Sequence, residues 1–252
     1  MPHILVTNDD GVQAPGLLAL VHAMRTLGDV TVFAPDRNWS ASGHVKTLHR
    51  PLRVNTVTLS DGSEAFSTDG APSDCVALAV LGLVQQPIDL VVSGVNTNYN
   101  LGHDVTYSGT VTAAMEAAIW HIPAIAFSTE AARGVGYGPS AQAAQQIAAQ
   151  VLAEGLPAYT LLNVNIPAIA EPRGYIVTRQ GLRVYRDQLD ARTDPQGRPY
   201  YWIGGEPPSG VEDPGTDYGE VMRGYVSITP LHLDLTAHAL LPEVQGWQFE
   251  MG

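Results

Sequence analysis

The chain of 252 residues has a formal net charge of −12, with 45% hydrophobic and 15% charged residues. This composition predicts a globular chain with a sizeable core, and it excludes a disordered tail, which needs few apolar and many charged residues. The negative charge argues against long nucleic acids and anionic membranes as partners, because both would repel the chain. The single cysteine, Cys75, excludes an intrachain disulfide and a cluster of thiolate ligands.

Strand and helix patterns alternate along the first 170 residues. Continuous apolar runs predict buried strands at 4–6, 30–34, 88–92, 124–127 and 159–164. Apolar residues at helical spacing predict helices at 15–27, 72–84, 109–120 and 140–152. The alternation predicts an α/β fold, with a doubly wound, mostly parallel, Rossmann-like sheet and helices on both faces.

Two segments depart from this alternation. Residues 45–68 have no helix signal and predict extended strands or an irregular insertion. Residues 171–252 predict a β-rich extension that acts as an oligomerisation arm, so that residues 1–252 form one domain with an α/β core over 1–170. Half of the twelve arginines lie within 173–198, against three aspartates, which gives that segment a charge of +3. We expect a salt-bridged surface there, or, if it reaches an active site, a preference for extended anionic substrates.

Asp9 and Asp10 directly follow the first predicted strand. Ligands of open α/β sheets bind at the carboxyl ends of the strands, where two adjacent carboxylates would repel each other. A hard divalent cation with oxygen ligands would relieve that repulsion. A tight turn at Asp9-Asp10-Gly11 is the alternative, since Asp and Gly favour turns.

Three further polar segments are predicted to reach the same edge. Residues 36–44 and 93–102 are loops rich in Ser, Asn and Gly, which offer hydroxyl and amide oxygens or simply form turns. Residues 107–112 begin a helix, where Ser108 caps the first turn and free backbone amides form a cradle for phosphate. Together with the two carboxylates, these segments predict a divalent-metal phosphate site and metal-assisted hydrolysis of a phosphate ester.

The motifs, taken in this order, resemble those of the SurE (survival protein E) family of metal-dependent nucleotide phosphatases. The similarity runs from residue 3 to about residue 236. The segments that carry it are Ile4–Gly11, Ala34–Arg37, Thr68–Val76, Ser93–Asn96, Asn100–Gly102, Tyr107–Val111, Asn163–Pro167 and Val226–Leu231.

The resemblance implies a set of site residues and a reaction. Its metal ligands correspond to Asp9, Asp10, Ser40 and Asn96, and its phosphate-binding residues to Asn100, Ser108, Gly109 and Thr110. It implies a hydrolase, a 5′-nucleotidase with one Mg²⁺ or Mn²⁺ per subunit, that acts on nucleoside 5′- and 3′-monophosphates and on short polyphosphate. We expect a cytoplasmic location, because residues 1–6 lack the basic segment, apolar stretch and cleavage site of a signal peptide. A water oriented by Asp9 or Asn8 would be the nucleophile. It further implies a homodimer or homotetramer formed through an exchanged C-terminal arm.

One residue departs from the family pattern. Asn98 stands where the family usually has glycine. Asn also tolerates left-handed backbone geometry, so the loop can be preserved, while the added side chain would narrow the pocket or alter base preference.

Two alternatives to this reaction remain. An aspartyl-phosphate phosphatase usually has one residue between its two aspartates, whereas Asp9 and Asp10 are adjacent. A non-catalytic nucleotide-binding module is the other alternative, although no glycine-rich dinucleotide or P-loop motif follows the first strand. Among the remaining residues we expect Cys75 in the core, Asp69 and Asp74 beside the helix at 72, and His103-Asp104 bordering the site.

Overall fold

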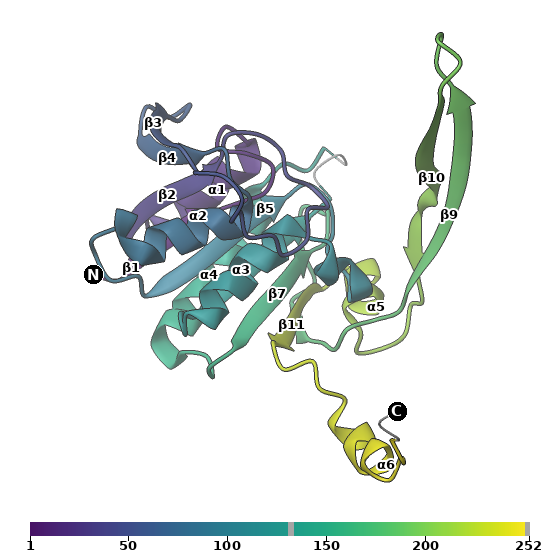
Figure 1. Ribbon diagram of the computed structural model, residues 1–252. Coiled ribbons are helices and arrows are strands. Elements are labelled where there is room, and N and C mark those ends of the chain that lie inside the picture. Colours follow the sequence, from purple (N-terminus) through teal and green to yellow (C-terminus); the bar gives the residue numbers. More distant parts are fainter. Residues whose placement is uncertain (131–133, 250–252) are drawn as a thin grey trace.

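The computed structural model describes residues 1–130 and 134–249, so the last three residues of the predicted extension lie outside the described residues. In this part of the chain, nine strands form one sheet in the order β3-β4-β2-β1-β5-β6-β7-β11-β8 (Figure 1). They are β1 (His3–Thr7), β2 (Asp29–Pro35), β3 (Val54–Thr58), β4 (Glu64–Thr68), β5 (Leu90–Asn96), β6 (Ala124–Thr129), β7 (Thr160–Ile166), β8 (Tyr175–Val177) and β11 (Val226–His232).

The central strands are parallel and buried. β4, β2, β1, β5, β6 and β7 pair in parallel with their neighbours, while β3 and β11 add antiparallel pairs to β4 and β7. All residues of β1, β5 and β6 are buried. Their uninterrupted apolar runs suit strands that are covered on both faces. The predicted doubly wound, mostly parallel α/β sheet is therefore confirmed.

Helices cover both faces of the sheet. Side chains of β1 alternate between the faces: Ile4 and Val6 pack with one helix pair, and Leu5 packs with the other. The first pair is α1 (Pro15–Met24) with α4 (Gly138–Glu154), and the second is α2 (Pro72–Leu78) with α3 (Gly109–Ile119). Cys75 on α2 is fully buried in the second layer, as predicted.

Two predicted elements differ from the observed ones. The helix predicted over 72–84 is α2 followed by a π-helical turn, η1 (Ala79–Leu83), because Gly82 has φ +126°. The strand predicted to end at Val92 continues to Asn96. Its pairing with β6 shifts register between Ser93 and Asn96, and Gly94 has φ +130° there. A Cβ on Gly94 would lie 2.2 Å from the carbonyl oxygen of Phe127, so the strand needs glycine at this point.

Residues beyond 170 contribute both to the sheet and to a projecting hairpin. β11 lies between β7 and β8 in the main sheet, and α5 (Asp217–Met222) precedes it. β9 (Arg183–Thr193) and β10 (Pro199–Gly210) form a separate antiparallel hairpin that extends away from the sheet (Figure 1). The chain then ends in a 3₁₀ turn, η4 (His238–Leu240), and α6 (Leu241–Gln245), which stand apart from the sheet.

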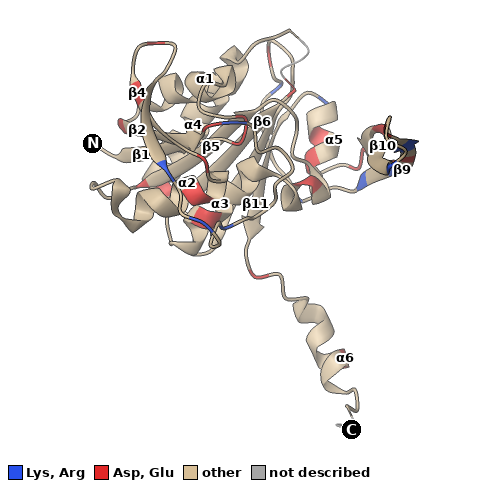
Figure 2. Cartoon of the chain, turned by 45° about the horizontal axis from the view of Figure 1, so that its top comes forward, with Lys and Arg blue, Asp and Glu red and all other residues tan. Residues whose placement is uncertain are grey.

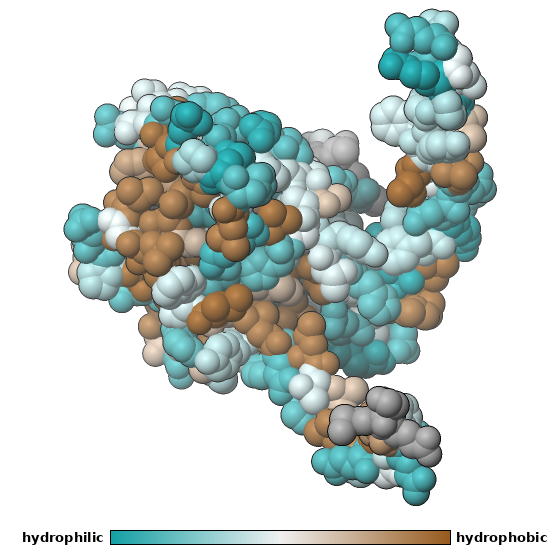
Figure 3. All heavy atoms as spheres, in the orientation of Figure 1, coloured by the Kyte–Doolittle hydropathy of each residue, from teal (hydrophilic) through white to brown (hydrophobic). Residues whose placement is uncertain are grey.

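The hairpin surface is largely charged and paired. Basic and acidic residues lie side by side on it (Figure 2), with ion pairs such as Arg192–Asp190 at 2.6 Å and Arg198–Asp194 at 2.9 Å. Exposed apolar side chains also gather there (Figure 3), including Leu189 and Ile203. None of the helices in the described ranges is long and apolar enough to cross a membrane.

Candidate functional site

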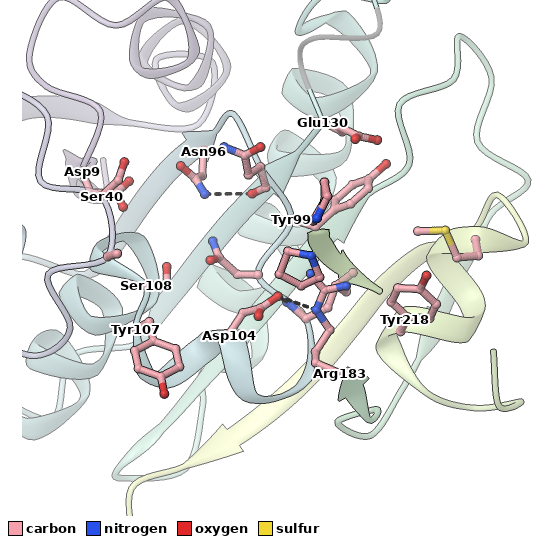
Figure 4. A pocket seen from close by; sticks show the side chains of 17 residues that line it. Asp9, Ser40, Asn96, Tyr99, Asp104, Tyr107, Ser108, Glu130, Arg183 and Tyr218 are labelled. Atoms are coloured by element: carbon pink, nitrogen blue, oxygen red, sulfur yellow. Dashed lines mark hydrogen bonds and ion pairs between the residues drawn. The ribbon is translucent and has the colours of Figure 1, made fainter. Parts of the chain in front are cut away.

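A polar cavity of about 460 Å³ opens at the carboxyl ends of β1 and β5. The sequence placed candidate residues at this edge of the sheet, and five of them line the cavity together (Figure 4). The lining candidates are Asp9, Ser40, Asn96, Asn100 and Ser108. The other candidates do not line the cavity: Asn8, Asp10 and Gly109 are chain neighbours of lining residues, and Thr110 donates a hydrogen bond to Asp9.

Asp9 is held between β1 and the start of α3. The carboxylate is 2% exposed, and its Oδ1 accepts a hydrogen bond from the hydroxyl of Thr110. The backbone oxygen of Asp9 accepts a hydrogen bond of 2.7 Å from the amide of Trp39. Burial raises the pKa of Asp9 above its usual range, and the hydrogen bond from Thr110 opposes part of this rise.

Asp10 is less buried and lies next to a like charge. Burial and the charge of Asp9 raise the pKa of Asp10 to about 6, although the backbone amide of Thr97 lowers it in part. Asn38 Nδ2 donates to Asp10 Oδ1 over 3.3 Å. Asp10 Oδ2 is buried and has no hydrogen-bond partner among residues 1–130 and 134–249. This carboxylate lacks the compensation that a buried charge requires.

Asn8 closes the turn that carries the two carboxylates. Its Nδ2 donates to the carbonyl oxygen of Gly11 over 2.9 Å, and the side chain is 1% exposed. Its Oδ1 is buried without a hydrogen-bond partner in the described part of the chain. The turn at Asp9-Asp10-Gly11 is therefore present. The oxygens of Asn8, Asp9 and Asp10 beside it form a local environment that favours a cation.

The oxygens at this edge meet the requirements of a hard divalent cation. The pKa values of two carboxylates are raised, and Asn8 Oδ1 and Asp10 Oδ2 have no hydrogen-bond partner among the described residues. Within the described residues, no three His, Cys, Asp or Glu side chains form a possible metal cluster. A cation here would thus need hydroxyl and amide oxygens beside the carboxylates, which is the donor chemistry that Mg²⁺ and Mn²⁺ accept.

Ser40 and Asn96 offer such neutral oxygens. Ser40 lies in the loop after β2, where its amide donates to Asn38 Oδ1 over 2.7 Å. Asn96 is the last residue of β5, and its Nδ2 donates to the carbonyl oxygen of Asn98 over 2.8 Å. Asn98 is not among the described non-glycine residues with positive φ, so its substitution for glycine requires no left-handed backbone. Its side chain lines the cavity, as expected for a residue that narrows it.

The first turn of α3 faces Asp9. Ser108 Oγ accepts a hydrogen bond of 3.1 Å from the amide of Val111, so the predicted N-cap is confirmed. A Cβ on Gly109 would lie 2.7 Å from Asp9 Cβ and 3.0 Å from Asp9 Oδ2. Only glycine allows the helix start to approach the carboxylate this closely. The positive end of α3 thus lies against the cavity, where it favours an anion.

Asn100 is fixed by residues from two strands. Its Nδ2 donates to Ser128 Oγ over 2.7 Å, and its backbone amide donates to Asn165 Oδ1 over 2.8 Å. Its carbonyl oxygen accepts hydrogen bonds from Nδ2 of Asn163 at 2.8 Å and of Asn165 at 3.0 Å. One of the two Nδ2 protons of Asn100 is left for a ligand in the cavity.

The outer wall of the cavity comes from residues that the sequence did not select. Arg183, at the start of β9, and Tyr218, on α5, lie across the cavity from Asp9 and Ser40 (Figure 4). Asp104, which was expected to border the site, lies on η2 (Gly102–Thr106) and also lines the cavity. The remaining lining residues are Ala41, Asn98, Tyr99, Leu101, Tyr107, Glu130, Pro207, Pro208 and Met222. The cluster of arginines was the one signal for this wall.

The fold and the site together define an α/β protein with a polar ligand cavity at the carboxyl ends of its parallel strands. The family model described as "Survival protein SurE" matches residues 4–187. A curated relative, "5'-nucleotidase SurE" of Chloroflexus aggregans, is 50% identical over 252 residues, which cover 98% of this chain and 100% of that protein. The "5'-nucleotidase SurE" of Herpetosiphon aurantiacus is 53% identical over 238 residues, 93% of each chain.

A solved structure has the same fold. The structure titled "Crystal Structure of Sure Protein from Aquifex aeolicus" has a TM-score of 0.81 and 42% sequence identity, and the match covers 97% of this chain and 98% of that chain. The chain therefore belongs to the SurE family, and the resemblance stated from the motifs is confirmed.

Proposed function

We propose that the protein is a metal-dependent phosphomonoesterase that hydrolyses nucleoside monophosphates to nucleoside and phosphate. The observation that carries this proposal is the carboxylate of Asp9, which lines the cavity against the N-terminus of α3 and is followed directly by the second carboxylate, Asp10. The names of the relatives, 5'-nucleotidases, support the same reaction. They do not favour the alternative of a non-catalytic binding module.

The proposed metal ligands are Asp9, Asp10, Ser40 and Asn96. Their oxygens belong to the types that Mg²⁺ and Mn²⁺ bind, and we propose one such ion per subunit. When bound, the ion would act as a Lewis acid that polarises the phosphoryl oxygen. The buried, unpartnered Oδ2 of Asp10 and the raised pKa of both carboxylates in the described part of the chain support a cation at this position.

The proposed phosphate-binding residues are Asn100, Ser108, Gly109 and Thr110. The backbone amides at the start of α3 donate toward an anion, and the free Nδ2 proton of Asn100 adds a side-chain donor. Thr110 holds Asp9 in place through its hydroxyl. We assign to Asp9 and Asn8 the orientation of the attacking water, because Asp9 lines the cavity and the Oδ1 of the adjacent Asn8 has no hydrogen-bond partner among the described residues.

The nucleoside part of the substrate would occupy the outer cavity. A volume of about 460 Å³ lies within the usual range for pockets that bind small molecules. Arg183 on the cavity wall is compatible with a negatively charged ligand. We therefore extend the proposed substrates to 5′- and 3′-monophosphates and short polyphosphate.

The proposed assembly is a homodimer or homotetramer formed through the C-terminal extension at 171–252, and the proposed location is the cytoplasm. Exposed apolar side chains on the hairpin and in the last segment support self-association, among them Ile203 at 84% and Phe249 at 74% exposure. A single buried cysteine supports a reducing compartment.

The direct test measures phosphate release from AMP and 3′-AMP with Mg²⁺, with Mn²⁺ and with excess EDTA. We expect turnover that depends on the metal and falls by about two to three orders of magnitude in Asp9→Asn, since that change removes a ligand charge. Turnover that persists in EDTA would contradict the metal role. A nucleotide that binds but is recovered intact after long incubation with metal would support the binding-module alternative.

A further inference from the structure

Glu116 is a buried carboxylate that none of the proposed steps uses. It lies on α3, two turns beyond the end that faces Asp9, and its side chain is 3% exposed. Lys46 Nζ donates to it over 2.8 Å, Trp120 Nε1 donates over 3.0 Å, and His44 Nε2 lies 3.0 Å away. Burial raises the pKa of Glu116, but these hydrogen bonds more than compensate and hold it at about 2. Glu116 is therefore a fixed negative charge at neutral pH.

Two of the groups that contact Glu116 belong to the segment that carries Ser40. We call residues 36–47 the Ser40 loop; they connect β2 to the strand pair β3 and β4 without regular structure of their own. The first anchor of this loop is the hydrogen bond from Trp39 N to Asp9 O, beside the carboxylates. The second is Gly43, whose amide donates to Tyr107 O over 2.9 Å and whose carbonyl accepts from Thr112 Oγ1 over 3.1 Å.

Further along the loop, Ser73 Oγ donates to Val45 O, and Thr47 Oγ1 donates to Asp74 Oδ2. Glu116 adds the ion pair with Lys46, in which both partners carry a full charge. Hydrogen bonds between ionised groups are stronger than those between neutral groups, above all where one partner is buried. The exposed loop residue Ser40 lies between the first and second anchors, so its position depends on how firmly the loop is held. A neutral hydroxyl contributes to a cation site only when it is held at the right distance.

We propose that Glu116 and Lys46 are positioning residues that hold the Ser40 loop against α3 and so keep the Ser40 hydroxyl in place for the cation. This inference rests on the proposed metal site. α3 thereby acts at both of its ends: the first turn lies against Asp9, and Glu116 two turns later holds the loop that passes over the same site. Binding of the cation and closure of the Glu116 contacts then favour each other.

Lys46 is the only lysine of the chain, which makes a direct measurement possible. Its side chain is 44% exposed, so an amine-acylating reagent can reach it. A short lysine peptide added to the same reaction provides the reference amine. Limited acylation with an N-hydroxysuccinimide acetate, followed by peptide mass spectrometry, gives the ratio of the two rates.

We expect Mn²⁺ to slow acylation of Lys46 relative to the reference peptide by about fivefold, the lower range of couplings between linked sites. An unchanged ratio, measured while calorimetry shows that Mn²⁺ is bound, would overturn the positioning role and leave the proposed function intact. Absence of Mn²⁺ binding in calorimetry would instead contradict the proposed metal site and this inference with it.

Three variants separate positioning from general stability. Lys46→Met removes the cation from a half-exposed side chain, and we expect the Kd for Mn²⁺ to rise by about tenfold because a charge-assisted hydrogen bond is lost. Lys46→Arg retains the charge and is expected to restore most of the affinity. The matched control is Arg25→Met, which removes the cation of an ion pair at 2.7 Å, Arg25–Asp61, remote from the cavity.

The metal dependence of turnover gives the second readout. In Lys46→Met, the Mn²⁺ concentration for half-maximal AMP hydrolysis is expected to rise in parallel with the Kd. A loss of stability in thermal unfolding with an unchanged Kd for Mn²⁺ would mean that Lys46 and Glu116 only stabilise the fold, and would overturn the proposal. Glu116→Gln would test the other partner of the ion pair, but it changes a buried group. If the Glu116→Gln protein does not fold, the Kd values of the Lys46 variants for Mn²⁺ decide between positioning and general stability.

Discussion

Arg183 Nε lies 2.8 Å from Asp104 Oδ2, and this ion pair joins the first residue of β9 to η2 at the rim of the cavity. The Nε–H group is not aligned for a hydrogen bond, so attraction between the charges dominates the contact. Tyr185 also donates its hydroxyl proton to Asp104 Oδ1 over 2.5 Å. The Arg183 guanidinium carbon lies 5.5 Å from the centroid of the Tyr218 ring. The base of the hairpin is therefore part of the cavity wall.

Replacement of Arg183 by Met is expected to weaken binding of nucleotides. Arg183 lies across the cavity from Asp9 and Ser40 (Figure 4), so it would contact the part of the substrate remote from the reacting phosphate. We expect the KM for AMP to rise by about tenfold with a smaller change in kcat, the pattern of lost uniform binding. Steady-state kinetics with AMP and with methyl phosphate check this, because the KM for methyl phosphate should change little. Arg186→Met, further along the same strand and more exposed, is the matched control.

Gly109→Ala is expected to lower AMP turnover strongly without unfolding the protein. The new Cβ would lie 2.7 Å from Asp9 Cβ, a distance that forces the carboxylate or the helix start to move. A displacement of this kind costs about a hundredfold in turnover. Gly138 begins α4 as Gly109 begins α3, and nothing lies within 4 Å of a Cβ placed on it. Gly138→Ala should therefore retain full AMP turnover, and equal losses in the two variants would contradict this account.

Asp10→Asn is expected to change the free energy of unfolding in opposite directions in the metal-free and the metal-loaded protein. The pKa of Asp10 is raised to about 6 from 3.8, so its contribution to the free energy of unfolding is fully present below pH 3.8 and is lost as the pH rises through 6. The variant no longer carries this charge, and we expect a gain in the free energy of unfolding at pH 7 without metal, reduced by the solvent that screens this partly exposed side chain. Stabilisation by Mn²⁺ should be lost. Thermal unfolding from pH 4 to 8, with and without Mn²⁺, measures both effects, and a less stable metal-free variant at pH 7 would contradict the prediction.

Asn165→Ala is expected to loosen the segment that carries Asn100. Asn165 is fully buried, and it both accepts from the amide and donates to the carbonyl of Asn100. Its loss leaves backbone groups without partners, and we expect a decrease of about 2 to 3 kcal/mol in the free energy of unfolding. Amide exchange of residues 97–102 should accelerate in the same variant. Asn55→Ala, at an exposed position of β3, should change the stability by less than about 0.5 kcal/mol.

The sequence predicted the parts of the fold in which local pattern and burial agree. The strand at 4–6 is apolar without interruption, and it became β1, buried on both faces. Pro15 marked the start of α1. Residues 45–68 contain the predicted extended strands as β3 and β4, and Asp74 caps α2, with its Oδ2 accepting from the amide of Ala71 over 2.9 Å. In each case, the signal lies within a few neighbouring residues.

Features that depend on contacts between distant segments could not be predicted from the local sequence pattern. Ser93–Asn96 was predicted as loop because its residues are polar, yet pairing with β6 and the geometry at Gly94 continue β5 through it. The pairing of β11 with both β7 and β8 depends on where the chain returns after the hairpin. Arg183 could not be distinguished from its five neighbouring arginines, because only the docking of β9 beside η2 brings this one to the cavity.

The sheet order has a consequence for the time at which the cavity can form during synthesis. β8 pairs with β11 alone among the described strands, and β11 begins only at Val226. Chains fold from the N-terminus as they emerge from the ribosome, so β8 has no partner until nearly the whole chain has been made. Arg183 and Tyr218 lie in the stretch between these two strands. A nascent chain therefore holds Asp9 and Asp10 at the end of β1 before it has the cavity wall that contains Arg183 and Tyr218.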